Sequence, residues 1–140
     1  MTVPVLSQDA AIVLALADTA VPYAFSLEDE AERWVRVMRL HGEVGRALQA
    51  LGVGEAPLET AAHPHAVRIL RRRENGENVV EIVADRAREL AHLRHARVVA
   101  TIDVLFAVFD VYENAFDRAL YVRGTSREEL IERLAAQTVR

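Results

Sequence analysis

Hydrophobic residues recur along this chain at steps of three and four positions, which is the spacing of one face of an α-helix. The pattern is clearest in LEDEAERWVRVM (residues 27–38), where apolar residues line one side and charged residues the other. Similar spacing runs through QDAAIVLALADTA (8–20), EVGRALQAL (43–51) and VVEIVADRARELAHL (79–93). Because the Pro residues and most of the few Gly residues fall between these segments, we expect an all-α domain.

The ends of the first two helices carry recognisable capping residues. Ser7 can cap the helix over 8–20, and Pro22 ends it. Ser26, with Asp29 three residues on, resembles a capping box with Asp in place of the usual Glu. Since the helix over 8–20 is apolar nearly all round, we expect it to be the buried central helix of the domain.

The chain resembles itself when it is shifted by 72 residues. The shift places Val44, Arg46, Ala47, Leu48, Gly52 and Leu58 over Phe116, Arg118, Ala119, Leu120, Gly124 and Leu130. Earlier in each half the offset is 75, between the expected caps Ser26 and Thr101, as a loop longer by three residues would produce. Two copies of a helical unit that is too small to bury its own apolar face would share one core.

This repeat defines an expected organisation of the whole chain. One domain would span residues 1–140, with about eight helices in two repeats of roughly four, related by a pseudo-twofold axis. Repeat one would cover about residues 5–60, a linker would cover 61–77, and repeat two would cover 78–138.

An acidic ladder within TIDVLFAVFDVYENAFDRAL (residues 101–120) raises the alternative of a metal or acid/base site. Its members are Asp103, Asp110, Glu113 and Asp117, which one unbroken helix would align on a single face. The 72-residue shift, however, places Gly42 over Asn114, and both residue types readily adopt the left-handed backbone conformation. We therefore expect a break within residues 112–114, with Asp103 and Asp110 on one helix and Asp117 on the next.

Broken in this way, the ladder favours solvated or capping roles for its acidic residues. Asp103 would follow a Thr101 cap by two residues, where a negative charge stabilises the positive end of the helix dipole. A small carboxylate metal protein that uses Asp110, Glu113 and Asp117 is the less favoured alternative.

Composition narrows the class of protein. The chain has 140 residues, of which 51% are hydrophobic, enough for one domain that folds without disulfides. Its net charge of −4 argues against binding to nucleic acid or to anionic membranes. No apolar run is long enough to span a bilayer, and the N-terminus lacks the basic start of a signal peptide. We expect a soluble cytoplasmic protein, in keeping with the lack of cysteine.

The residue types needed for common catalytic and cofactor sites are missing or wrongly spaced. Without cysteine there is no thiolate nucleophile or cysteine-based metal site, and without lysine there is no Walker phosphate loop. Neither Ser7 nor Ser126 lies in a Gly-rich elbow. The histidines lack the i, i+4 pairing with a carboxylate that a helical metal site needs, so we expect no enzyme activity, cofactor or metal. They are His41, His63, His65, His92 and His95.

The second half of the chain contains, in order, ADRARELAHL, RVV, AT, IDVLFAVF, YEN, AFDRALYVRG and SREELIERLA. A helix rich in Ala and Arg thus leads through a short extended stretch into a small residue, an apolar helix, a turn and two further helices. This order resembles one repeat of the Clp N-terminal domain, the double repeat at the front of Clp-type AAA+ unfoldases. The first half, from LSQDAAIVLALADTA to EVGRALQALGV, matches in the same order but less well.

The resemblance implies a non-catalytic module that docks substrate or adaptor proteins for an AAA+ unfoldase in a chaperone, proteolysis or stress-response system. The unfoldase would be joined in the same chain or act as a separate partner. Leu27 and Ile102 replace the family's acidic residue after the small residue, so recognition of phosphorylated arginine is not expected. A stand-alone helical regulatory or dimerising protein is the alternative.

Two apolar lead-ins to capped helices form the candidate binding surface. PYAFS (22–26) and RVVAT (97–101) would occupy equivalent places in the two halves, as extended segments before a helix start whose free N–H groups can receive a carboxylate or carbonyl. If Tyr23, Phe25 and Val98 pack into the core instead, this surface is inert. The candidate residues for binding a protein or peptide are Tyr23, Phe25, Ser26, Val98, Val99 and Thr101.

Overall fold

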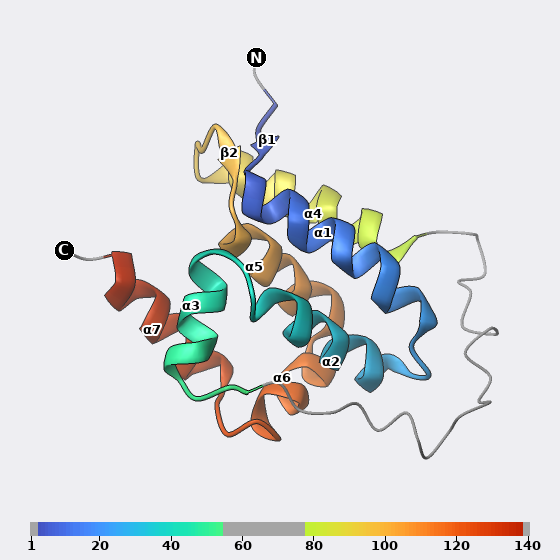
Figure 1. Ribbon diagram of the computed structural model, residues 1–140. Helices are drawn as coiled ribbons and strands as arrows, with labels where there is room; N and C mark the ends of the chain where they lie inside the picture. Colours follow the sequence, from blue (N-terminus) through green and yellow to red (C-terminus); the bar gives the residue numbers. More distant parts are fainter. Residues whose placement is uncertain (1–2, 55–77, 139–140) are drawn as a thin grey trace.

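The computed structural model describes residues 3–54 and 78–138. Within these ranges the chain is helical except for one pair of short strands (Figure 1), so the all-α class is confirmed. The described ranges hold seven α-helices and one 3-10 turn, while the end of the expected repeat one and the expected linker lie outside them. The elements are β1 (Val5–Leu6), α1 (Gln8–Ala20), the 3-10 turn η1 (Val21–Tyr23), α2 (Leu27–Met38), α3 (Gly42–Ala50), α4 (Val79–Leu93), β2 (Val98–Val99), α5 (Thr101–Tyr112), α6 (Asn114–Tyr121) and α7 (Arg127–Thr138).

The starts of α1 and α2 form as their sequences predict. Ser7 is the N-cap of α1, and its hydroxyl accepts a hydrogen bond from the Ala10 N–H at 3.0 Å. At the start of α2, the Ser26 hydroxyl accepts the Asp29 N–H at 3.1 Å, while the Asp29 carboxylate accepts the Phe25 N–H at 2.9 Å. The Asp29 carboxylate thus binds the N–H of the residue before the cap and not that of Ser26, so the expected capping box forms only in part.

The central helix is α5, and α1 lies on the outside of the domain. α5 contacts α1, α2, α3, α4 and α6 (Figure 1), and Asp110 is its only exposed residue. Only one side of α1 is buried, and Leu16 on the other side is 38% exposed. The expectation that α1 would be central was wrong because its outward positions include small alanines, Ala11 and Ala15, which lose little by exposure.

A chain of buried hydrogen bonds ties α2 to α5. The Trp34 indole N–H donates to the Tyr112 hydroxyl at 3.0 Å, and that hydroxyl donates to the Glu30 carboxylate at 2.7 Å. All three side chains are buried. Because buried polar groups are tolerated only when they find partners, these contacts fix how α2 and α5 meet in the core.

The helices α3 and α6 end in the same way, 72 residues apart. Gly52 follows α3 with a φ of 85°, and Gly124 follows α6 with a φ of 86°. After each glycine, the next N–H reaches back to a buried leucine carbonyl, as in a Schellman motif. These bonds run from the Val53 N–H to the Leu48 oxygen (3.0 Å) and from the Thr125 N–H to the Leu120 oxygen (3.1 Å).

The expected break between α5 and α6 is confirmed. α5 ends at Tyr112 and α6 begins at Asn114. The residue in the left-handed region is Glu113, with a φ of 50°, and not Asn114 as the shift to Gly42 suggested. Asp110 and Asp117 therefore belong to different helices, and the acidic ladder does not exist as one helical face.

A short parallel sheet connects the N-terminal segment to the start of α5. β1 pairs with β2 in the register Val5 to Val98 and Leu6 to Val99. The Val5 N–H donates to the Arg97 carbonyl at 3.1 Å, and the Ser7 N–H donates to the Val99 carbonyl at 2.9 Å. This pairing of two segments that lie more than 90 residues apart was not expected from the sequence.

Candidate functional site

The first candidate segment, PYAFS, is only partly available to a partner. Tyr23 is 59% exposed, while Phe25 and Ser26 are half-buried. The segment is not extended throughout, because Val21–Tyr23 form the 3-10 turn η1. Its polar groups are also occupied, since the Phe25 N–H bonds to Asp29 and the Ser26 hydroxyl caps α2. At this helix start the Asp29 N–H, one of the donors that were expected to be free, is bound by the Ser26 hydroxyl.

In the second candidate segment, RVVAT, only Val98 of the named residues faces solvent. Val98 is 41% exposed, whereas Val99 and Thr101 are buried. Neighbouring strand residues point to opposite faces, so Val99 points inward because Val98 points outward. Thr101 is covered by the start of α3, where its hydroxyl accepts the Val44 N–H at 3.4 Å. Val99 and Thr101 are therefore part of the interior of the fold.

The cap of α5 differs from the expected one. Ala100, and not Thr101, is the N-cap, and the Asp103 carboxylate accepts the Ala100 N–H at 2.8 Å. The same carboxylate takes two hydrogen bonds from the Arg94 guanidinium, which raises the pKa of Arg94 above its ordinary value. Asp103 is thus a capping residue as expected, but it is buried and not solvated.

The exposed residues of the two segments do not share one surface. Tyr23 follows the C-terminal end of α1. Val98 pairs with Val5, which precedes the N-terminal end of the same helix. Because α1 has 13 residues, about 20 Å of helix separates these places. The expected composite site is therefore two separate places.

The acidic residues of the metal alternative are held apart. Asp110 accepts a hydrogen bond from Arg86 at 2.8 Å. Asp117 receives two from Arg127, at 3.0 and 3.1 Å. Glu113 forms the turn between their helices. Across residues 3–54 and 78–138, no three His, Asp or Glu side chains gather in a way that could hold a metal ion.

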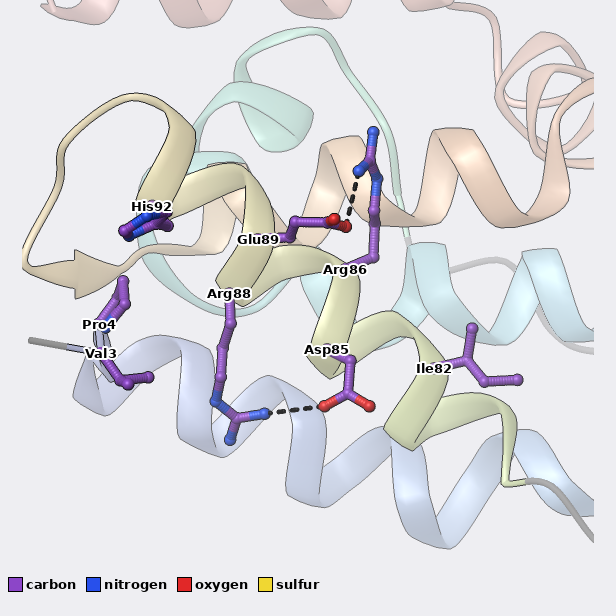
Figure 2. Close-up of a pocket in the computed structure, with 8 residues that line it drawn as sticks. All are labelled: Val3, Pro4, Ile82, Asp85, Arg86, Arg88, Glu89 and His92. Atoms are coloured by element: carbon purple, nitrogen blue, oxygen red, sulfur yellow. Dashed lines mark hydrogen bonds and ion pairs between the residues drawn. The ribbon is translucent and has the colours of Figure 1, made fainter. Parts of the chain in front are cut away.

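A hollow lies beside the N-terminal segment. It has a volume of about 620 Å³, and Figure 2 shows Val3 and Pro4 beside the charged face of α4. On that face Arg86 pairs with Glu89 at 2.8 Å, and Arg88 pairs with Asp85 at 3.4 Å. The other lining residues are Ile82 and His92.

Next to this groove, the outer face of the sheet is apolar. Val5 is 63% exposed and stands directly beside Val98 in the strand register. Val3, two residues before Val5, is exposed as well and lines the groove. The sequence reading missed Val3 and Val5, although the β-branched valines in VPVL were an available signal for a short strand.

No protein-family model matches this chain, and no curated protein matches its sequence significantly. Among the described helices, none combines the length and apolar content that crossing a membrane requires.

Proposed function

We propose that this chain is a non-catalytic docking module, built from two copies of one helical unit, that recruits substrate or adaptor proteins to an AAA+ unfoldase. The unfoldase belongs to a chaperone or proteolysis system and is joined in the same chain or acts in trans. The matching helix ends at Gly52 and Gly124, 72 residues apart, carry this proposal. They occur in a chain whose sequence resembles the Clp N-terminal domain.

A match between α2 and α5 supports the duplication. Both helices have 12 residues. Asp29 is the third residue of α2 and Asp103 the third residue of α5. Each carboxylate accepts an N–H from the residues just before its helix, Phe25 and Ala100 respectively. Equal helix lengths and an aspartate at the same helical position are what two copies of one unit would keep.

The surface chemistry suits protein docking. The carboxylates of Asp103, Asp110 and Asp117 are engaged in ion pairs that join one element to another. By contrast, apolar side chains such as Val5 and Tyr23 remain on the surface. Exposed apolar anchors are typical of places where proteins bind other proteins.

Site-specific photo-cross-linking in the host cell tests this function. A photo-reactive amino acid placed at Val98 should cross-link to identified clients, adaptors or an AAA+ unfoldase, while the same group at the exposed Glu132 on α7 should not. In a reconstituted reaction, the added protein should also change the rate at which the host unfoldase and its protease degrade casein. If no such partner is cross-linked and the degradation rate is unchanged, the proposed function is wrong.

One observation favours the dimerising alternative as a second candidate. Tyr121 and Val122, at the end of α6, are adjacent and strongly exposed apolar residues. A second copy of the chain could cover them. Sedimentation velocity of the wild-type chain and of Val122→Asp distinguishes the cases. A dimer that Val122→Asp converts to a monomer supports this candidate, and a wild-type monomer at high concentration excludes it.

A further inference from the structure

We propose that the free edge of β1 binds an extended acidic peptide as a third strand, next to the groove between the N-terminal segment and α4. The inference rests on the proposed docking function and names its surface and the chemistry of its partner. The surface, called here the strand edge, consists of Val3, Val5, Leu6, Arg97 and Val98.

The backbone of β1 leaves one edge open. The Val5 and Ser7 N–H groups both face β2, where they bond to Arg97 and Val99. Because neighbouring strand residues direct their backbone groups to opposite edges, the Leu6 N–H and the Leu6 and Pro4 carbonyls face away from β2. In residues 3–54 and 78–138 no other backbone or side-chain group bonds to the Leu6 N–H. An added strand supplies the missing partners.

The exposed face of the same sheet offers apolar contacts to alternate side chains of such a strand. Val5 and Val98 stand side by side on it, and the exposed Val3 lies two residues before Val5. The adjoining groove of about 620 Å³ is of the size of clefts that hold ligands or short peptide stretches. Figure 2 shows that Val3 and Pro4 form one wall and that α4 forms the other.

Charge selects the class of peptide. The segments that build the sheet, residues 3–8 and 92–102, contain no acidic residue in a chain of net charge −4. They carry two arginines and two histidines, and of the arginines Arg94 is already paired with Asp103. Arg97 is exposed and has no carboxylate partner among the described residues. A partner with negative side chains therefore complements this end of the molecule.

Acidic groups near the strand edge do not reverse this selection. On α4, Asp85 and Glu89 are paired with Arg88 and Arg86. Asp9, in the first turn of α1, is exposed and lies beyond the strand residues. Among the described residues, the arginine charge left without a partner next to the sheet is thus that of Arg97, which directly precedes β2.

The test uses labelled synthetic peptides and the full chain, with binding followed by fluorescence anisotropy. One eight-residue probe alternates Val with Glu, and its match replaces each Glu by Lys. The acidic probe should bind at least about tenfold more tightly than the basic one. Two further acidic probes carry N-methyl groups on every second backbone nitrogen, one at the odd-numbered residues and the other at the even-numbered residues. Only one of these two should bind, since a strand added at an edge uses alternate N–H groups.

Variants locate the site. Val5→Asp and Arg97→Glu should each weaken the acidic probe at least about tenfold, because they place negative charge at the strand edge. Val122→Asp and Arg133→Glu make the same changes at exposed places on α6 and α7 and should leave binding unchanged. Cooperative thermal melts of all four verify folding, and should Val5→Asp fail to fold, the N-methylated probes still decide the binding mode.

Several results would overturn the inference. They are equal binding of the acidic and basic probes, tolerance of both methylation patterns, or unchanged affinity in Arg97→Glu. Its failure is distinguishable from that of the docking function. If Arg97→Glu still cross-links to the unfoldase or its clients through position 98, the module docks proteins and the strand edge is not the site. If the wild type cross-links to none of them, the docking function itself is wrong.

Discussion

The Arg94 guanidinium binds both oxygens of the Asp103 carboxylate, with its Nε 2.8 Å from Oδ1 and its Nη2 2.6 Å from Oδ2. The Asp103 side chain is only 3% exposed, whereas that of Arg94 is about half-exposed. Since Oδ2 also accepts the Ala100 N–H, one carboxylate closes the turn after α4 and starts α5. The pair therefore holds β2 in the place where β1 can join it.

Removing the arginine should destabilise the fold. Arg94→Gln leaves the buried Asp103 carboxylate with fewer donors, which should lower the free energy of unfolding by about 1–3 kcal/mol. Urea denaturation measures the change. Arg88→Gln is the matched control, because its pair with Asp85 is exposed and its loss should cost no more than about 0.5 kcal/mol. Equal effects of the two changes would contradict the structural role given to Asp103.

The stability that the ion pair of Arg94 and Asp103 contributes should not change as the pH rises from neutral to moderately alkaline. Hydrogen bonding to Asp103 raises the pKa of Arg94 above its already strongly basic ordinary value. A raised pKa gives stability that is complete below the unfolded-state pKa and is lost only as pH rises through the folded-state pKa. The difference in unfolding free energy between the wild type and Arg94→Gln should thus be the same at roughly pH 7 and pH 9. A difference that shrinks over this interval would contradict the assignment.

Arg123 is expected to stabilise the fold little despite its burial. Its side chain is 5% exposed, its Nη1 lies 3.1 Å from a Glu32 carboxylate oxygen, and its Nε and Nη2 are buried without hydrogen-bond partners among the described residues. Arg123→Met should leave the free energy of unfolding unchanged or raise it by about 1 kcal/mol, because it removes a buried charged group with two unsatisfied nitrogens from the interior.

Removal of the other partner of this ion pair, Glu32, serves as the control for Arg123→Met. Glu32→Ala deprives the buried guanidinium of its carboxylate and should cost roughly 3 kcal/mol. Urea denaturation of both variants measures the asymmetry. If Arg123→Met is the more destabilising of the two, Arg123 makes contacts that offset its burial and the prediction is wrong.

Gly42 should tolerate substitution less well than Gly52. Both have positive φ values, 71° and 85°, so alanine at either position costs about 1–2 kcal/mol of backbone strain. A Cβ at Gly42 would also lie 2.7 Å from the Thr101 hydroxyl oxygen, whereas a Cβ at Gly52 meets open space. Thermal melts should therefore show a larger loss for Gly42→Ala than for Gly52→Ala. Similar losses would mean that α3 can move away from Thr101 at little cost.

The sequence by itself determined where the helices lie and how they start. The bounds of α1, α2 and α4 agree with their hydrophobic spacing, and Ser7 and Ser26 cap the helices they were expected to cap. The break between α5 and α6 followed from comparing Gly42 with Asn114. These features depend on hydrogen bonds and side-chain directions within a few residues, so the local sequence specifies them.

Only the tertiary structure decided which segments meet. It placed α5 and not α1 at the centre, paired Val5 with Val98, and buried Thr101 beneath the start of α3. It also gave the left-handed turn to Glu113 and an arginine partner to the buried Asp103. Each of these features is a contact between residues far apart in the chain or depends on how whole helices pack. Local spacing leaves such contacts undetermined, because many arrangements of the same amphipathic helices bury their apolar faces about equally well.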